Sequence, residues 1–409
     1  MHLNFILNKN KPLASITLKI MDQDSTHLVQ TPIRIAPEMW DVEKERPKNI
    51  YLKVYKSLNQ RLNRLKIGIV AYLKEKKGIV SLAGLNRQVR KLMLQKSNVS
   101  YKEDSLLYHM DRYIHLRKHF ITLSTFKRYV VFIRMIERYQ GHCMNELMIN
   151  KVNAEFVKRF LEFGKDEQYS QSTIYRSIHF VRTVLNFLEK RGIRTFAYEV
   201  ELPKVAKPKK DFITLDEKEL QAIKETAVPD SLQPAKDWLI ISCFTGQRIS
   251  DFMEFSADKL KVIKDKKCIA FSQKKTGKSI LLPLHPAVTE ILKNDRSFPA
   301  RLSVQRYNLQ IKEVVRLAGI TGKIDVRKRR GFRSRTETIQ KWEAVSSHIG
   351  RRSFASNFYG KIPTPLLMEA TGHSTEEMFR RYICDADNER AILLGNYFEN
   401  YNKTLTQKV

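Results

Sequence analysis

Six residues, widely spaced along the chain, could together break and rejoin a phosphodiester bond. They are Arg248, Lys275, His348, Arg351, His373 and Tyr382. A tyrosine suits the role of nucleophile because the phenol has a pKa of about 10, so phenolate leaves a phosphate ester more readily than an aliphatic alkoxide does. Two guanidinium groups can bind non-bridging phosphate oxygens in bidentate fashion. A lysine or a histidine can donate the proton that the departing 5′ oxygen requires.

The order and spacing of these residues carry the prediction, because each residue alone is weak evidence. A single tyrosine on a helix is more often a packing residue, and a Lys-Thr-Gly-Lys turn can be a plain hairpin tip. Two lysines are adjacent at this turn, and we assign the role to Lys275 rather than Lys274 because Lys275 directly precedes Thr276 and Gly277. Asp251, three residues after Arg248, is placed to orient that arginine or to buffer its charge.

The elements expected around these residues would hold them on a rigid scaffold. Arg248 follows a Thr-Gly turn at the end of an apolar helix around residues 238–244, and a hairpin over residues 268–282 carries Lys275 at its tip. His348 and Arg351 are three residues apart, so they share one face of a helix that opens after Ser347 and whose N-terminal dipole adds positive potential. Capping boxes at residues 214–217 and 374–377 predict the starts of two more helices, and the second of these ends near Tyr382.

This constellation resembles the tyrosine recombinase family, the phage-type integrases of bacterial mobile elements, over about residues 210 to 390. The resemblance implies that Arg248 and Arg351 clamp the phosphate and that Lys275 is the general acid. It also implies that His348 assists proton transfer at the nucleophile, that His373 hydrogen-bonds the phosphate, and that Tyr382 attacks to form a 3′-phosphotyrosyl intermediate. It implies neither a metal nor any other cofactor.

The same resemblance implies a site-specific DNA recombinase, an integrase that integrates or excises a mobile element. Its partners would be double-stranded DNA with specific attachment sites, further copies of the chain in a homo-tetramer on that DNA, and accessory DNA-bending or directionality proteins. An apolar stretch at residues 391–398 would pack into a neighbouring subunit, with docking on its own domain as the alternative.

Three other functions stay open from the sequence. They are a DNA invertase or resolvase of the same family, a type IB topoisomerase, and a catalytically inactive DNA-binding regulator. The six filled positions disfavour the inactive regulator. The N-terminal domain and the apolar tail disfavour the topoisomerase.

Composition independently indicates a nucleic acid partner. The chain has 74 Lys and Arg against 43 Asp and Glu, a net charge of +31, and the basic residues are spread over every region. Positive charges in this excess repel one another unless a polyanion is bound. Because the basic residues are not gathered in one amphipathic helix, an anionic membrane surface is the less favoured partner. A charged run over residues 323–335 predicts a solvated loop. We expect DNA contacts from the linker, from this run and from the residue beside Arg351: Lys207, Lys209, Lys210, Arg327, Lys328, Arg329, Arg330 and Arg352.

The chain is predicted to be a multidomain, mainly α protein. Residues 1–100 alternate like strands and then, from Leu58, follow a helical period, which predicts a small α+β arm-type DNA-binding domain or a plain α+β domain of unknown use. Residues 103–202 predict an all-helical core-binding domain, and residues 203–210 predict a linker with two prolines. Residues 211–409 predict a mixed, mainly α catalytic domain with a small antiparallel sheet and a C-terminal tail.

Targeting and redox features are few. No run approaches the roughly 18 apolar residues of a membrane span, and the first residues do not resemble a signal peptide. The four cysteines, Cys143, Cys243, Cys268 and Cys384, fit no zinc spacing. These features predict a cytoplasmic protein, and the family resemblance implies a bacterial one associated with the nucleoid.

Overall fold

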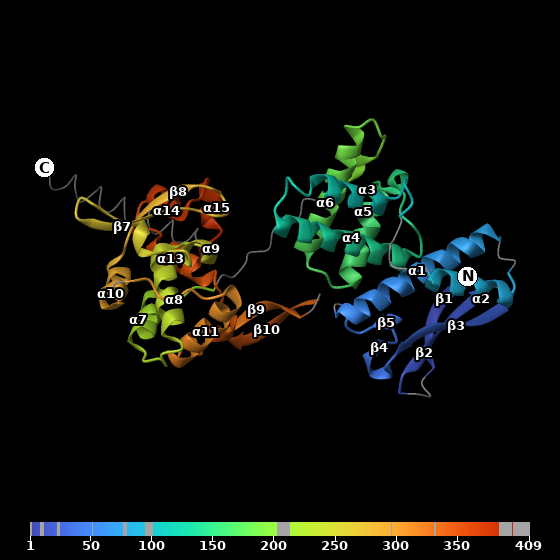
Figure 1. The fold of residues 1–409 in the computed structure, drawn as a ribbon, viewed down its shortest axis with the longest axis horizontal. Coiled ribbons are helices and arrows are strands. Elements are labelled where there is room, and N and C mark those ends of the chain that lie inside the picture. The colour runs from blue at the N-terminus through green and yellow to red at the C-terminus, as the bar shows by residue number, and fades with distance from the viewer. Residues whose placement is uncertain are drawn as a thin grey trace. The chain divides into compact units, whose positions relative to one another are not determined.

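The computed structural model describes residues 2–8, 12–22, 25–50, 52–76, 80–94, 101–202, 213–295, 297–330, 333–383 and 395. The fold is mainly helical with small antiparallel sheets, which confirms the predicted fold class (Figure 1). The chain divides into two compact units, formed mainly by residues 1–206 and by residues 207–409.

A three-stranded antiparallel sheet begins the first unit. Strands β1 (His2–Asn8), β2 (Ala14–Asp22) and β3 (Ser25–Ile35) pair in the order β1-β2-β3, and the short strands β4 (Trp40–Asp41) and β5 (Arg46–Pro47) follow. Alternate residues of the sheet, such as Phe5, Leu18 and Val29, are buried. They share one core with helices α1 (Lys53–Glu75) and α2 (Leu82–Leu94). The two-residue period of the sequence therefore marks the buried face of the sheet.

In the described part of residues 101–202 the α-helices are α3 (Leu106–Arg117), α4 (Leu123–Cys143), α5 (Ala154–Asp166) and α6 (Gln171–Glu189). The first three begin at Ser105, Thr122 and Asn153, whose side chains each accept a backbone N–H of the first turn. Their apolar faces meet in a core rich in aromatic rings, where Tyr129 and Phe180 stack with 4.0 Å between ring centroids.

Two carboxylates join the sheet domain to these helices within the first unit. Glu167 accepts hydrogen bonds from Lys44 and Arg46. Glu137 on α4 accepts hydrogen bonds from Gln60 and Tyr101. The limits expected for these two domains, residues 1–100 and 103–202, stay predictions, and residues 95–100 lie outside the described residues.

Helix α8 (Gln233–Thr245) lies at the centre of the second unit. It packs against α7 (Glu217–Glu225), α10 (Pro286–Asp295), α11 (Val304–Leu317) and α13 (Ile349–Phe358). Trp238, Phe252 and Tyr307 are fully buried in the surrounding core. Strands β6 (Leu260–Ile263), β7 (Lys266–Ser272) and β8 (Ser279–Pro283) form an antiparallel sheet, which includes the expected hairpin. The other described helices are α9 (Ile249–Phe252), α12 (Lys341–Ala344), α14 (Thr364–Thr371) and α15 (Glu376–Arg380).

The charged run at residues 323–335 is part of a β-hairpin, so the prediction of a solvated loop was wrong. Strand β9 (Lys323–Arg330) pairs with β10 (Arg333–Gln340). Half-buried Ile324 and Val326 alternate with exposed neighbours. Residues branched at Cβ at every second position favour a strand, and the prediction failed because it weighed only the charges.

Both predicted helix starts lie one or two residues further along the chain, and of these two helices only α7 has a capping box. Helix α7 has a reciprocal box in which the Asp216 carboxylate accepts the Glu219 N–H at 2.8 Å and the Glu219 carboxylate accepts the Asp216 N–H at 2.9 Å. Helix α15 begins after Thr375 rather than Ser374. Because Ser, Thr and Asp are all good N-caps, the pattern alone allowed both registers.

No helix in the described part of the chain is long and apolar enough to cross a bilayer. Cys143, Cys243 and Cys268 are free thiols, and Cys384 lies outside the described residues.

Candidate active site

A glycine turn at the end of α8 places Arg248. Gly246 caps the helix with a left-handed φ of 66°, and a Cβ at this position would lie 2.5 Å from the ring of Phe354. Only glycine meets both demands. Arg248 follows as the N-cap of α9, and its Nη1 donates to Oε1 of Gln273 at 3.1 Å.

Asp251 does not orient Arg248 in the way that the sequence suggested. Its buried carboxylate accepts the backbone N–H of Lys274 at 3.0 Å and the hydroxyl of Ser250 at 3.2 Å. It therefore fixes the turn between β7 and β8, and the side chain that Arg248 bonds is Gln273. Asp251 is close to Arg248 in the sequence, but the sequence does not show that the Asp251 side chain points toward the Lys274 backbone instead.

Arg351 is almost fully buried, with 2% of its surface exposed. It projects from α13, which packs tightly on α8 because Gly350 leaves no side chain between the helices. Its Nη1 donates to the Gly246 carbonyl at 2.9 Å, and its Nη2 donates to the Thr371 carbonyl at 2.8 Å. Burial, followed by the charge of Arg248, lowers the pKa of Arg351 to about 10. Arg351 therefore stays charged at neutral pH, and its Nε has no partner among the described residues.

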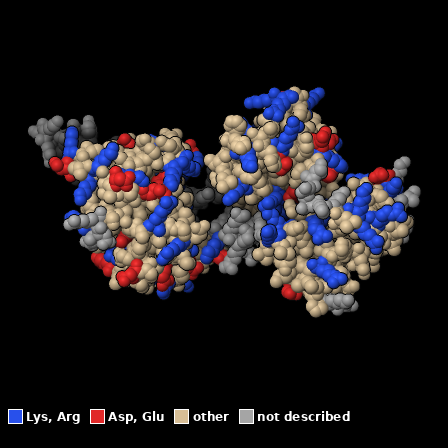
Figure 2. Space-filling view, in the orientation of Figure 1, with Lys and Arg blue, Asp and Glu red and all other residues tan. Residues whose placement is uncertain are grey.

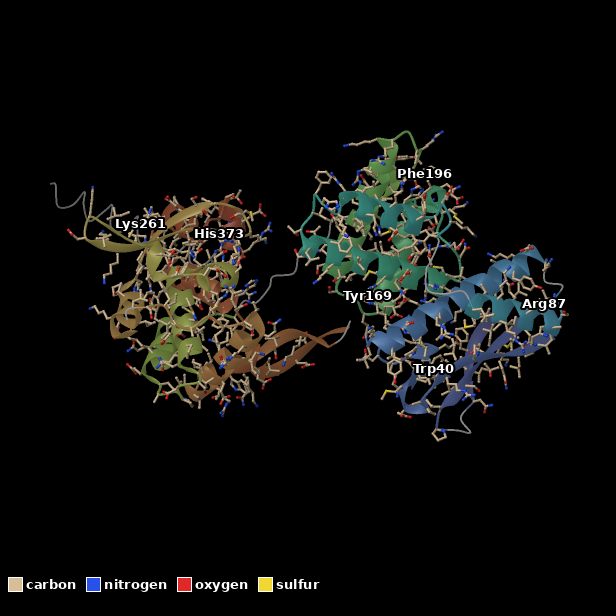
Figure 3. The ribbon with its side chains drawn as sticks, viewed as in Figure 1. Trp40, Arg87, Tyr169, Phe196, Lys261 and His373 are labelled. Atoms are coloured by element: carbon tan, nitrogen blue, oxygen red, sulfur yellow. The ribbon has the colours of Figure 1, made fainter. Side chains whose placement is uncertain are left out.

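His373 is buried beside Arg351 and directly follows Gly372, the C-cap of α14. Figure 3 labels His373 in the second unit. Its Nε2 lies 2.8 Å from Nη2 of Arg351, and its Nδ1 lies 2.8 Å from Oγ1 of Thr371. Thr371 donates its single hydroxyl hydrogen to the Leu367 carbonyl, so Nδ1 of His373 carries the proton and Nε2 accepts from Arg351. Burial first, and then the charges of Arg351, Arg248 and Lys278, lower the pKa of His373 to about 3. The ring is therefore neutral.

Tyr382 lies next to both of these residues. Its ring centroid is 5.1 Å from that of His373 and 5.4 Å from Cζ of Arg351. Helix α15 ends at Arg380, so Tyr382 sits in the turn that follows rather than on the helix itself. Two backbone contacts hold this turn: the Tyr382 N–H donates to the Phe379 carbonyl, and Ser356 Oγ donates to the Tyr382 carbonyl.

His348 completes the group at the start of α13. It is the N-cap of that helix rather than part of its first turn. Partial burial of the ring lowers the pKa of His348, and the charges of Arg352, Arg351, Arg248 and Lys275 lower it further. These four cations therefore share the surroundings of one neutral imidazole.

The two adjacent lysines of the β7–β8 turn differ in their contacts. Lys274 Nζ forms an ion pair with Glu254 at 3.0 Å, and its backbone N–H is held by Asp251. Lys275 is exposed at the tip, before Gly277, whose φ of 70° closes the turn. Of the two lysines, Lys275 is therefore the one whose positive charge helps to lower the pKa of His348.

The predicted DNA-contacting residues are less well described. Arg352 is half-buried on α13. Arg327, Lys328, Arg329 and Arg330 lie on β9, and only the side chain of Lys328 among them is described. Lys207, Lys209 and Lys210 lie outside the described residues. Lys and Arg side chains are numerous on the face of each unit seen in Figure 2.

Sequence reasoning missed two residues of the site, Gln273 and Thr371. Gln273 bonds Arg248, and Thr371 holds both Arg351 and His373. The contacts of Gln273 reach residues 25 and 98 positions away in the chain, so no local pattern could have revealed them. No three His, Cys, Asp or Glu side chains come together as a metal site within the described ranges.

Two family models match this chain. The model of the phage integrase family matches residues 213–389. The model of the phage integrase SAM-like domain matches residues 105–195. The chain belongs to the phage integrase family and is a tyrosine-type site-specific recombinase.

Solved structures of similar fold include integrases from phage lambda and from the transposon Tn1549. A lambda integrase dimer bound to a COC′ core site has a TM-score of 0.50 and 18% identity, over 73% of this chain and 86% of that one. The Tn1549 transposon integrase in complex with transposon right end DNA has a TM-score of 0.53 and 14% identity, over 72% of this chain and 99% of that one. At these identities the likeness shows the fold. A comparison with curated protein sequences found no match.

Proposed function

We propose that the protein integrates or excises a mobile DNA element through a covalent 3′-phosphotyrosyl intermediate. The observation that supports this most directly is the packing of Tyr382 against His373 and Arg351. Three residue types from three chain segments meet there, and they are the types that metal-free phosphoryl transfer requires. The charge of Arg248 acts on Arg351 and His373, and the charge of Lys275 acts on His348.

In the proposed cleavage step, the Tyr382 oxygen attacks the scissile phosphorus and the bond from phosphorus to the 5′ oxygen breaks. His348, neutral because its pKa is lowered, accepts the phenol proton. Lys275 donates a proton to the departing 5′ oxygen. In the joining step, the 5′ hydroxyl of another strand attacks the phosphotyrosine, and the same proton transfers run in reverse. Bond energy is kept in the ester, so no nucleotide is consumed.

Arg248 and Arg351 would stabilise the charge of the pentavalent phosphorus. Arg351 is held by two backbone carbonyls and is already rigid before DNA binds. Its Nε has no partner among the described residues, but this atom is buried, so a phosphate oxygen could reach it only if neighbouring side chains move. His373 has partners on both ring nitrogens, so hydrogen bonding from His373 to the phosphate would require the ring to exchange one of them.

We further propose double-stranded DNA with specific attachment sites as the substrate, bound by four copies of the chain. The net charge of +31 supports a polyanionic partner. The similar lambda and Tn1549 proteins are described as bound to DNA. In this proposal Lys207, Lys209, Lys210, Arg327, Lys328, Arg329, Arg330 and Arg352 contact phosphates, and the N-terminal sheet domain binds accessory sites with the help of DNA-bending or directionality proteins.

The test is a covalent trapping assay. Duplexes that carry candidate element ends, with a nick near the cleavage position, are incubated with the full chain and denatured. The wild type should give a protein–DNA adduct, and Tyr382→Phe should give none. Tyr198→Phe, which alters an exposed tyrosine of the first unit, is the matched control and should react like the wild type. An adduct that persists in Tyr382→Phe would overturn the proposal, and relaxation of arbitrary supercoiled plasmid would indicate a topoisomerase instead.

A further inference from the structure

Gln273 is a buried glutamine with every hydrogen-bonding position of its carboxamide in use. Only 1% of its surface is exposed. Oε1 accepts from Arg248 Nη1 at 3.1 Å and from Thr276 Oγ1 at 2.8 Å. Nε2 donates to Gln247 Oε1 at 3.1 Å and to the Thr371 carbonyl at 3.0 Å. A carboxamide has two acceptor sites and two donor hydrogens, so this side chain is fully satisfied and has a single orientation.

These four bonds join three segments that are distant in the sequence. Arg248 belongs to the turn between α8 and α9, Thr276 to the turn that carries Lys275, and Thr371 to the end of α14. The Thr371 carbonyl also accepts from Arg351, so one backbone oxygen links Gln273 to the second arginine. Gly372 packs directly against the Gln273 side chain, because a Cβ at position 372 would lie 2.6 Å from Oε1 of Gln273.

We propose that Gln273 is the positioning residue that aligns the phosphate-binding arginines with the proton donor. This inference rests on the proposed function and extends it to a residue that touches no reacting atom. If Gln273 is lost, Arg248 loses its side-chain partner and Thr276 no longer holds the turn of Lys275. The two halves of the site then move independently.

The chemistry of the amide explains why this position is a glutamine. A carboxylate would hold Arg248 more strongly, but it would neutralise the charge that a phosphate needs. It would also face two oxygen acceptors, Gln247 Oε1 and the Thr371 carbonyl, to which a carboxylate has no hydrogen to donate. A neutral amide orients the arginine and leaves its charge available.

The test compares single-turnover cleavage of two DNA substrates, one ordinary and one with sulfur in place of the bridging 5′ oxygen. A thiolate leaves without a proton, since the pKa of a thiol is only about 8.5, so the sulfur substrate does not depend on the general acid. We expect Gln273→Met to cleave ordinary DNA about 100-fold more slowly than the wild type. Sulfur should recover part of this loss, because the acid is bypassed while Arg248 stays misplaced.

Thr276→Val separates the two contacts of Gln273 Oε1, because it removes the bond to the lysine turn and leaves the bond to Arg248. It should slow cleavage of ordinary DNA and leave the sulfur substrate near the wild-type rate. Gln310→Met is the matched control. Its carboxamide bonds the Ser231 carbonyl in the same unit and no residue of the site, so both rates should stay within about threefold. Equal losses on both substrates in both variants would overturn the proposal.

A measurement without DNA keeps this inference separate from the proposed function. Hydrogen exchange should show faster exchange in Gln273→Met at the Lys274, Gly277 and His373 amides, which now bond Asp251, Gln273 and Met368. Amides of α8 and α11 should stay protected. If the wild type cleaves neither substrate, the proposed function fails, and the exchange result still decides the role of Gln273. Unchanged protection at these amides would overturn it.

Discussion

Arg351 and His373, 22 residues apart in the chain, are joined by a hydrogen bond of 2.8 Å between Nη2 and Nε2. An arginine can only donate, so Nε2 of His373 must accept and the imidazole must be neutral. Thr371 fixes the other nitrogen as the protonated one. His373 thus orients Arg351 by accepting its hydrogen bond. Because the imidazole is neutral, it leaves the positive charge of Arg351 uncompensated, which a carboxylate would not do.

This bond makes the stability of the second unit depend on pH. The pKa of His373 is about 3 in the folded chain and about 6.5 in an unfolded chain. Below about pH 6.5 the unfolded chain binds the proton and the folded chain does not, so stability falls as the pH decreases toward 3. We expect the His373 contribution to be on the order of a few kcal/mol across this window. It should be absent from His373→Gln.

Urea unfolding at pH 7.5 and pH 5 measures this difference. Trp40 belongs to the first unit, so Trp40→Phe in both proteins leaves Trp238 and Trp342 to report on the second unit. The wild type should lose more stability on acidification than His373→Gln does. Equal losses would show that His373 is protonated as readily in the folded chain as in the unfolded one.

Glu167 should stabilise the joint between the N-terminal sheet domain and the helices that follow it. Burial tends to raise the pKa of Glu167, but Arg46 and Lys44 outweigh this effect and lower it. The carboxylate therefore stabilises the joint above its unfolded pKa of about 4.3 and loses this effect as the pH falls further. Glu167→Gln should cost about 1–3 kcal/mol at neutral pH.

A double-mutant cycle with Arg46→Gln checks the origin of that cost. The two substitutions together should cost clearly less than the sum of the separate costs, because each one alone already breaks the same ion pair. Thermal unfolding at pH 7 supplies the four values. Simple additivity would mean that Glu167 acts through some other contact.

Gly350 sets the distance between α8 and α13, and therefore between Gly246 and Arg351. A Cβ at this position would lie 2.0 Å from Oγ of Ser242. Gly350→Ala should destabilise the second unit by about 1–3 kcal/mol through overpacking, and it should weaken DNA cleavage because Arg351 moves with the helix. Gly322→Ala, where a Cβ would meet nothing within 4 Å, is the control in thermal unfolding and cleavage assays. A neutral Gly350→Ala would show that the helices separate at little cost.

Much of this fold could be predicted because buried apolar residues recur in the sequence with the period of a helix or a strand. Leu62, Leu65 and Ile69 follow the helical period and are buried on α1. The hairpin around Lys275 and the helix before Gly246 were also visible, because glycines with positive φ punctuate both. The order of six residues was enough to predict the family, which the family models confirm: Arg248, Lys275, His348, Arg351, His373 and Tyr382.

The contacts within the site could not be predicted, since they depend on side-chain directions across long sequence separations. Asp251 has the right spacing to orient Arg248 but bonds the turn of Lys274 instead. Gln273 gives no signal of its own, because a glutamine beside lysines is ordinary in an exposed turn. His348 is a helix N-cap, although the pattern placed it inside the helix.

Substituting each of the two adjacent lysines of the β7–β8 turn tests which one donates the proton to the departing 5′ oxygen. Lys274 pairs with Glu254 at 3.0 Å and its N–H is fixed by Asp251, whereas the charge of Lys275 acts on His348. Lys275→Ala should therefore slow cleavage of ordinary DNA by about 100-fold or more, because the general acid is lost. Cleavage of DNA with sulfur at the bridging 5′ position should be nearly normal. Lys274→Ala removes an ion pair at the surface, where solvent screens the charges, and it should change neither rate by more than about fivefold. If the two variants exchange these behaviours, Lys274 is the proton donor, and its pairing with Glu254 is broken when DNA binds.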